Sequence, residues 1–403
     1  MPQSSNGSLL SSVLSLPVEE QEAGGFRHTL QEIRQQPELW EITARQIAPL
    51  LDRWRGLLEK SRAVVFTGSG SSHYAGECLV HAVQRATGLP ACVISSGELL
   101  LLRDAALPPI RPLLMVSFAR SGDSPESAEL IRRLLEDEPE VRHLVITCNR
   151  HGRLAEIWGA EGLEPCSRVE IVTLDDRTCD RSLVMTSSFT NLALAGLGLA
   201  YVSDPTGFLA AAAKLARLGN ELLVNWSDRL AEVAAGSYRR MIVLGDGSGY
   251  GAARESALKT LEMTDGRVAT MAETTLGFRH GPMCSLHRDA LLVMFLSSDL
   301  VRRAYQLDLL EEIQRKGLGG QKILVGGNAD FAPLEKDDLT IGIGEPDDSP
   351  DEWAALLCAV IGQLLAFFRC RAEGLRPDEP AANGAISRVV SEFRFHTATH
   401  HPR

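Results

Sequence analysis

The sequence predicts an α/β protein made of two similar lobes, each built around a parallel sheet. Short apolar runs of the buried-strand type are followed by a tight polar loop and a helical pattern, first at 62–85 and again at 113–136. Units of the same kind return at a constant offset in the second half of the chain. At 403 residues, the chain is long for one domain and comfortable for two.

The offset of the repeat is the 177 residues that separate Gly68 from Gly245. A constant period of this kind indicates an internal duplication. In the second lobe, residues 296–299 replace the Ser/Arg loop of the first, so we expect one lobe alone to bind an anion. The other matched positions are Val65 with Ile242, Gly70 with Gly247, Ser71 with Ser248, Ala75 with Ala252, Leu114 with Leu291, Val116 with Val293, Phe118 with Phe295 and Ser121 with Ser298.

Composition narrows the function classes. A formal charge of -11 and a pI near 5.5 argue against nucleic-acid binding, so a phosphorylated ligand must be held by local donors. The eight cysteines contain no C-x-x-C pair, which favours reduced thiols over a disulfide framework or a zinc site. No signal peptide and no apolar run long enough to span a membrane is visible. We therefore expect a soluble, cytoplasmic protein with no membrane partner.

The remaining elements follow from local pattern. Residues 1 to about 24 are Ser-rich and then acidic, so we expect them to bury little and to carry no catalytic role. Two helical patterns separated at Pro37 fill 26–60. The expected strands are 62–67, 92–95, 113–118, 143–147, 169–172, 291–295 and 323–325, and the further expected helices are 125–136, 185–200, 208–236, 254–264 and 356–368.

The loop after the strand at 113–118 suits an anion. Ser124 fits the N-cap of the next helix and Pro125 its first position, so free N–H groups point back at the loop. The hydroxyls of Ser121 and Ser124 and the charge of Arg120 would suit a phosphate monoester. The alternative is an ordinary capped turn with an exposed arginine, because any helix start favours anions.

A helix at 254–264 places Glu255, Lys259 and Glu262 on one face. The alternative to a functional role is a solvated salt-bridge stripe, in which each pair contributes about 0.3–0.5 kcal/mol. His280 lies on an expected loop between Arg279 and a Gly-Pro turn, where a histidine is available for chemistry. A carboxylate and an imidazole near a sugar phosphate can open the ring and move a proton between C1 and C2, without a metal or other cofactor.

These motifs carry a resemblance. The segments 117–124 (SFARSGDS), 255–259 (ESALK) with Glu262, and 277–282 (GFRHGP) resemble those of the sugar isomerase (SIS) family, best known from the isomerase half of glucosamine-6-phosphate synthase. The similarity covers roughly residues 45–390. Together with TCDRSLVMTSS and the terminal ISRVV, they resemble most the branch called tagatose-6-phosphate ketose/aldose isomerase or galactosamine-6-phosphate deaminase/isomerase.

The resemblance implies an α/β fold of two tandem flavodoxin-like SIS lobes, each with a parallel five-stranded sheet in three layers. It implies a homodimer or homotetramer with a shared active site and a sugar-phosphate substrate. The domains expected are an N-terminal extension and helix at 1–45, the phosphate-binding lobe at 46–205, a helical linker at 206–236, the second lobe at 237–375 and a tail at 376–403.

The resemblance also implies residue roles. Glu262 matches the base of the C1/C2 proton shift, and His280 matches the ring-opening residue, which in the family comes from the neighbouring subunit. The catalytic C-terminal lysine of the synthase has no clear match, since Arg388 lies three residues off register; Lys259 is the alternative. The implied substrate-binding residues are Gly70, Ser71 and Ser72 in the first loop, Arg120, Ser121 and Ser124 in the phosphate loop, where Ala119 replaces a serine, and Thr186 and Ser187 in the third.

No glutaminase domain precedes the lobes in this sequence, which leaves isomerisation or deamination as the expected reaction. We expect conversion of galactosamine 6-phosphate into tagatose 6-phosphate and ammonia. The alternatives are a plain aldose/ketose isomerase, a deglycase acting on a fructosamine-type 6-phosphate, and a non-catalytic sugar-phosphate-binding regulator.

Overall fold

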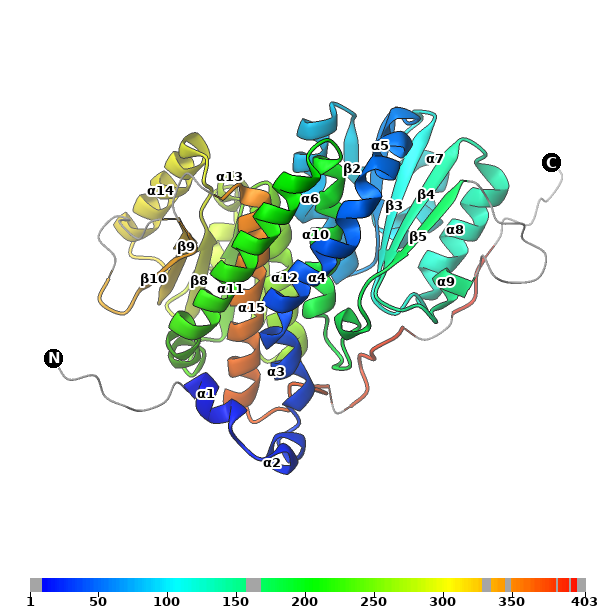
Figure 1. Cartoon of the computed structure of the whole chain (residues 1–403). Coiled ribbons are helices and arrows are strands. Elements are labelled where there is room, and N and C mark those ends of the chain that lie inside the picture. The colour runs from blue at the N-terminus through cyan, green and yellow to red at the C-terminus, as the bar shows by residue number, and fades with distance from the viewer. Residues whose placement is uncertain are drawn as a thin grey trace.

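The computed structural model describes residues 9–156, 168–327, 335–344, 349–381, 383–390 and 393–396. Two five-stranded sheets form the protein, and every strand pair in them is parallel (Figure 1). The strand orders are β2-β1-β3-β4-β5 and β7-β6-β8-β9-β10, so both sheets have the flavodoxin-like order. The predicted fold class is therefore confirmed.

The first lobe begins with β1, whose five residues are all buried because both faces of a parallel sheet are covered by helices. The central strand β3 is likewise buried throughout. The elements of this lobe are β1 (Ala63–Thr67), α6 (Ser71–Thr87), β2 (Ala91–Val93), α7 (Ser96–Ala106), β3 (Leu113–Ala119), α8 (Pro125–Asp137), β4 (Val141–Thr147), α9 (Arg153–Glu156), β5 (Val169–Thr173) and α10 (Ser187–Leu197).

The second lobe repeats this order. In this lobe the local pattern did not predict the strands β7 and β10, the helix α14, or the short helix α13, which forms where a loop was expected. Both strands lie at the edges of the sheet. The elements are β6 (Arg240–Leu244), α12 (Ser248–Met263), β7 (Ala269–Glu273), α13 (Thr275–Phe278), β8 (Ala290–Phe295), α14 (Leu300–Arg315), β9 (Lys322–Gly326), β10 (Leu339–Gly342) and α15 (Asp351–Ala372).

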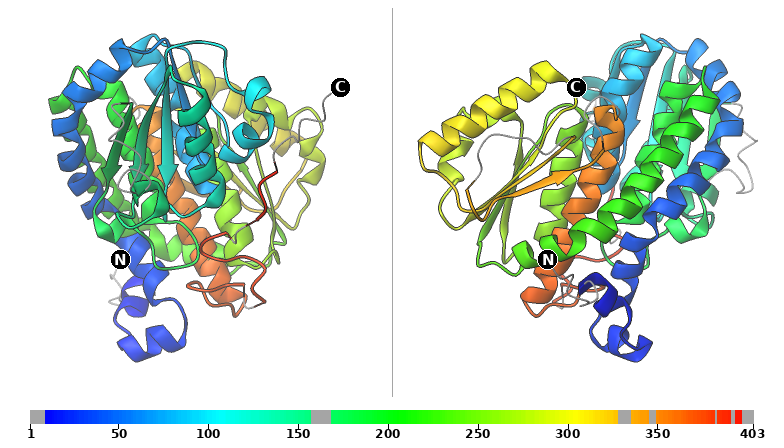
Figure 2. Two further views of the ribbon diagram at one scale, coloured as in Figure 1. Left: turned by 90° about the vertical axis from the view of Figure 1, so that its right-hand side faces the viewer. Right: turned by 60° about the vertical axis from the view of Figure 1, so that its left-hand side comes forward.

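Helices fill the space between the two sheets. The long helix α11 (Pro205–Ala234) packs beside α15, and α12 packs against both α15 and α6 (Figures 1 and 2). One continuous apolar core joins residues of both sheets through these helices. Within the described residues, α15 is long and apolar enough to cross a membrane, but 94% of its apolar window is buried inside the protein.

The expectation that the N-terminal segment buries little is confirmed for residues 14–24 and is wrong for Leu10 and Val13. Two short helices, α1 (Leu9–Leu14) and α2 (Val18–Ala23), form there, and Leu10 and Val13 join the core. Residues 1–8 lie outside the described part. The helical region that follows consists of α3 (Arg27–Arg34), α4 (Gln36–Ile47) and α5 (Leu51–Glu59), with Pro37 in the first turn of α4. The seven described cysteines are free, and Cys166 lies outside the described residues.

A buried histidine in β4 makes the stability of the first lobe depend on pH. His143 is fully buried, and neither of its ring nitrogens has a hydrogen-bond partner among the described residues. Burial, with a smaller contribution from Arg168, lowers the pKa of His143 to about 3. The folded protein therefore holds this imidazole neutral, whereas the unfolded chain protonates it near pH 6.5.

The His143→Leu substitution is expected to flatten the acid side of the stability profile. The stabilisation that comes from keeping His143 neutral is fully present above pH 6.5 and is lost as the pH falls toward 3. At pH 5 this loss lowers the free energy of unfolding by about 2 kcal/mol. Urea unfolding at pH 7 and pH 5 measures this loss, which the variant should lack. The same substitution at exposed His151 is the control, and equal pH dependence in the two variants would contradict the account.

Candidate active site

A cavity of about 470 Å³ lies where the carboxyl ends of β1 and β3 face α12 of the other lobe. Ligands of open α/β sheets bind at this position, where the strand order reverses. Both lobes and the C-terminal tail contribute to its wall. The lining residues are Ser69, Gly70, Ser71, Ser72, Phe118, Ala119, Arg120, Ser121, Ser124, Ser127, Leu183, Met185, Leu258, Lys259, Glu262, Gly384, Ala385, Ile386, Ser387, Arg388 and Val390.

The loop between β1 and α6 is built on glycines. A Cβ on Gly68 would lie 2.7 Å from the side chain of Ser72, which is too close for any other residue. Gly70 has a φ of 55°, a conformation that glycine adopts readily. The resulting tight turn starts α6 at Ser71 and places the Ser71 hydroxyl 3.1 Å from the ammonium of Lys259.

The loop between β3 and α8 presents hydroxyls and free N–H groups to the cavity. Ser124 occupies the N-cap position of α8, and its side chain makes no capping hydrogen bond. The Ser121 hydroxyl accepts a bond from the N–H of Asp123 at 3.1 Å. Gly122, with a φ of 69°, lets the chain turn between them. The first N–H groups of α8 and these two hydroxyls can therefore surround an oxyanion.

Arg120 connects three parts of the wall. Its guanidinium donates to the carbonyl of Leu183 at 2.9 Å and to the carbonyl of Arg388 at 2.5 Å. Its Nε is buried without a partner among the described residues. Burial lowers the pKa of Arg120, although nearby Asp180 opposes the shift. Arg120 thus ties the β3–α8 loop to the segment before α10 and to the tail.

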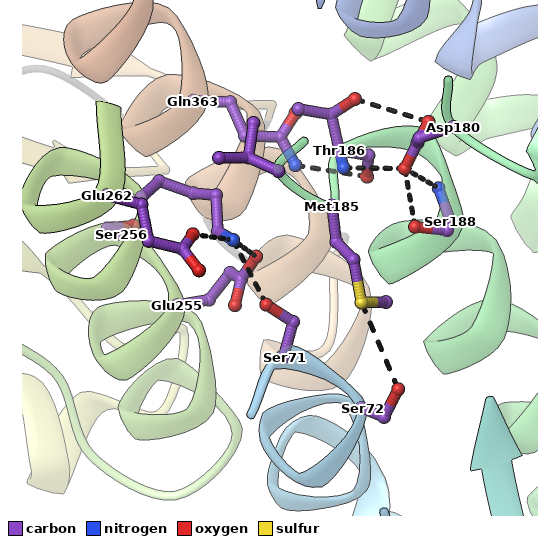
Figure 3. A network of polar contacts seen from close by, with 12 residues as sticks. Ser71, Ser72, Asp180, Met185, Thr186, Ser188, Glu255, Ser256, Glu262 and Gln363 are labelled. Atoms are coloured by element: carbon purple, nitrogen blue, oxygen red, sulfur yellow. Dashed lines mark hydrogen bonds and ion pairs between the residues drawn. The ribbon is translucent and has the colours of Figure 1, made fainter. Parts of the chain in front are cut away.

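Three ionisable groups on α12 meet inside the cavity wall (Figure 3). The Lys259 ammonium lies 2.5 Å from Oε2 of Glu262 and 3.5 Å from Oε1 of Glu255. Glu255 and Lys259 are 0% and 1% exposed, so the interpretation as a solvated stripe is wrong for them. Lys259 and Glu262 both line the cavity, and the Glu262 side chain is the more exposed of the two at 23%.

The electrostatics of this group follow from burial and charge. Burial raises the pKa of Glu255 to about 7. The positive charge of Lys259 lowers this pKa, but by less than burial raises it, and the negative charge of Glu262 raises it further. Burial alone would lower the pKa of Lys259, but the carboxylates of Glu255 and Glu262 outweigh it and raise that pKa. The ammonium is therefore charged at neutral pH, and Glu255 can hold or release a proton there.

Asp180 organises the third loop, and the sequence analysis did not single it out. Its buried carboxylate accepts hydrogen bonds from the backbone N–H and the hydroxyl of each of Thr186, Ser187 and Ser188, at the start of α10. Figure 3 shows Asp180 beside Thr186 and Ser188. Thr186 and Ser187 were predicted to bind substrate, but the structure directs both hydroxyls to Asp180, outside the cavity lining. The sequence signal that could have identified this role is an acidic residue six positions before three consecutive hydroxyl residues.

Two other predicted residues occupy different places. Arg388 lies on the cavity wall, where its guanidinium donates to the carbonyl of Asp180 at 2.6 and 2.8 Å and contacts the sulfur of Cys179. His280 follows α13, is exposed, and is not among the described residues that line the cavity of its own chain. The cavity thus gathers Gly70, Ser71, Ser72, Arg120, Ser121, Ser124, Lys259, Glu262 and Arg388.

Comparison with known proteins identifies the class. D-galactosamine-6-phosphate deaminase AgaS of Escherichia coli O157:H7 is 30% identical over 91% of this chain and 95% of its own length. A Streptomyces coelicolor protein to which the same name is provisionally assigned is 34% identical over 95% of this chain and 98% of its own. The crystal structure of tagatose-6-phosphate ketose/aldose isomerase from Escherichia coli matches with a TM-score of 0.80 at 27% identity, covering 92% of this chain and 97% of that one.

A search against protein-family models gave no match. The relatives and the fold nevertheless define an enzyme that acts on sugar phosphates, of the isomerase and deaminase class. The chain belongs to the sugar isomerase (SIS) family, in the branch that contains the galactosamine-6-phosphate deaminases and the tagatose-6-phosphate ketose/aldose isomerases.

The Asp180→Ala substitution is expected to lower the free energy of unfolding by about 3 kcal/mol or more, since it leaves buried donors without an acceptor. The matched control is Asp176→Ala, because Asp176 is 69% exposed and forms a surface pair with Arg150. That variant should lose less than about 1 kcal/mol. Chemical denaturation measures both, and equal losses would show that Asp180 does not hold the loop.

Proposed function

We propose that the enzyme converts galactosamine 6-phosphate into tagatose 6-phosphate and ammonia. The observation that carries the proposal is the meeting of an oxyanion loop from lobe one with Lys259 and Glu262 from lobe two in one cavity. The names of the sequence relatives support the choice of sugar and of deamination. The proposal assigns substrate and mechanism to this chain beyond the class that the family defines.

In this proposal, the phosphate is held by the hydroxyls of Ser121 and Ser124 and the first N–H groups of α8. Arg120 keeps that loop in place through the two carbonyls that it contacts and adds positive charge nearby. The sugar chain then runs from the phosphate toward α12. Ser71 and Ser72 line the cavity between these two ends and are placed to contact sugar hydroxyls.

Proton transfer is assigned to Glu262. After ring opening, the Glu262 carboxylate removes the proton from C2 of the amino sugar, which gives an enolamine, and returns it to C1. Water then adds to C2 of the resulting imine, and ammonia leaves. Lys259, at 2.5 Å from the carboxylate, holds its orientation and can stabilise negative charge that develops on the C1 oxygen. Glu255 is a positioning residue behind the ammonium.

The Glu262→Gln substitution is expected to lower kcat for ammonia release from galactosamine 6-phosphate by about 10²–10⁴-fold, the range typical of a lost general base. The amide keeps the size of the side chain, so KM should change little. Ammonia release by a coupled assay measures this, with the exposed Glu311→Gln as control. Unchanged turnover in Glu262→Gln, or none in the wild-type enzyme, would contradict the proposal.

A second candidate is isomerisation without loss of nitrogen, which the names of two structural neighbours favour. It uses the same proton shift on a sugar that carries a hydroxyl at C2. The two reactions separate in one experiment, in which galactosamine 6-phosphate and tagatose 6-phosphate are each offered to the enzyme and products are resolved by chromatography.

We further propose that the active site is shared between subunits, with His280 opening the ring of the sugar bound to the neighbouring chain. The exposure of His280 and its place outside the cavity of its own chain support this arrangement. Mixing inactive Glu262→Gln and His280→Ala chains under subunit exchange should restore activity, to roughly a quarter of wild type in a random dimer. No recovery in exchanged mixtures would place His280 outside the site.

A further inference from the structure

Lobe two has a loop that corresponds to the proposed phosphate loop of lobe one. At the 177-residue offset, Gly70 and Gly247 precede their helices with nearly identical backbone angles, φ 55° and ψ -125° against φ 54° and ψ -124°. At the same offset, Ser121 corresponds to Ser298. The loop after β8 therefore occupies the position in its lobe that the loop after β3 occupies in the other.

A carboxylate of the chain itself is bound in this loop. Asp351 accepts hydrogen bonds from the Ser297 hydroxyl at 2.5 Å, from the Ser298 N–H at 2.7 Å and from the Ser298 hydroxyl at 2.8 Å. The guanidinium of Arg302 lies 3.0 Å from Oδ2 of Asp351, the oxygen that also accepts the bond from Ser297. Two hydroxyls, one backbone N–H and one arginine are the donor set that suits a phosphate or sulfate.

The difference in helix length between the lobes explains why Asp351 reaches this loop. Gln363 donates to the carbonyl of Thr186, the residue that corresponds to it at the same offset of 177. Helix α10 starts directly after Thr186, whereas α15 starts at Asp351, more than three turns before Gln363. The additional N-terminal turns of α15 take the place of the loop that precedes α10 in lobe one. The first residue of these turns, Asp351, contacts the loop between β8 and α14.

We propose that lobe two retains a second oxyanion site, of the class that binds phosphate or sulfate, which the carboxylate of Asp351 occupies as a built-in ligand. The inference rests on one part of the proposed function, namely that the loop after β3 in lobe one binds phosphate. It implies one sugar-phosphate site per chain, because the second loop is closed by the enzyme's own side chain. Arg302, 45% exposed and close to Gly247, stands at the open side of the site.

The test is rescue by inorganic phosphate. All proteins carry Ser121→Ala, to weaken the site in lobe one, and melting temperatures are compared in phosphate and in sodium chloride of equal ionic strength. Asp351→Ala should melt lower than its parent in chloride, and phosphate should recover at least half of that loss. Adding Ser298→Ala should abolish the recovery. Asp308→Ala removes an exposed charge from α14 and should respond to phosphate as the parent does.

An equal response to phosphate in the parent, Asp351→Ala and Asp308→Ala would overturn the proposal, as would recovery that survives Ser298→Ala. Should Asp351→Ala not fold, Asp351→Ser gives the same comparison with a smaller loss of polar contacts. The comparison among these variants depends on the β8–α14 loop and does not require catalytic turnover. A failure of the ammonia assay would therefore count against the proposed reaction and leave this comparison intact.

Discussion

The site depends on the contacts that the buried ammonium of Lys259 makes with its neighbours. A buried charge is tolerated when partners surround it, and here the partners come from both lobes: two carboxylates on its own helix and the Ser71 hydroxyl at the start of α6. This contact fixes the distance between α12 and the β1–α6 loop. The carboxylate of Glu262, which we propose as the base, is held beside the same nitrogen, so the packing of the lobes also sets the orientation of this carboxylate.

The two lobes share a topology and differ at the carboxyl ends of their strands. In lobe one, a non-helical segment anchored by Asp180 precedes α10 and leaves room for the cavity, which the tail closes from one side through Arg388. In lobe two, the corresponding helix is longer and its first residue binds the equivalent loop. The difference in the length of one helix therefore leaves the loop after β3 open to the cavity and fills the corresponding loop after β8 with a side chain of the protein itself.

The sequence predicted those features that depend on local pattern or on parallel-sheet topology. Strand–loop–helix units place their loops at one edge of the sheet, so the sequence alone predicts that Ser71, Ser121 and Ser124 lie close together. The structure places all three in the wall of one cavity. Thr186 and Ser187 were assigned to the site by the family resemblance, and in the structure both hydroxyls donate to the carboxylate of Asp180. The bond from Ser297 to Asp351 joins residues 54 apart and depends on the length of α15, which no local pattern reveals.

The central claim is that the phosphate loop of one lobe and the carboxylate of the other act on the same sugar. A crystal structure of the Glu262→Gln variant with galactosamine 6-phosphate tests it most directly. The account predicts the phosphate on the hydroxyls of Ser121 and Ser124 and the C2 carbon within about 3–3.5 Å of the residue 262 amide. A phosphate bound elsewhere, or a C2 carbon out of reach of that amide in every subunit, would contradict it.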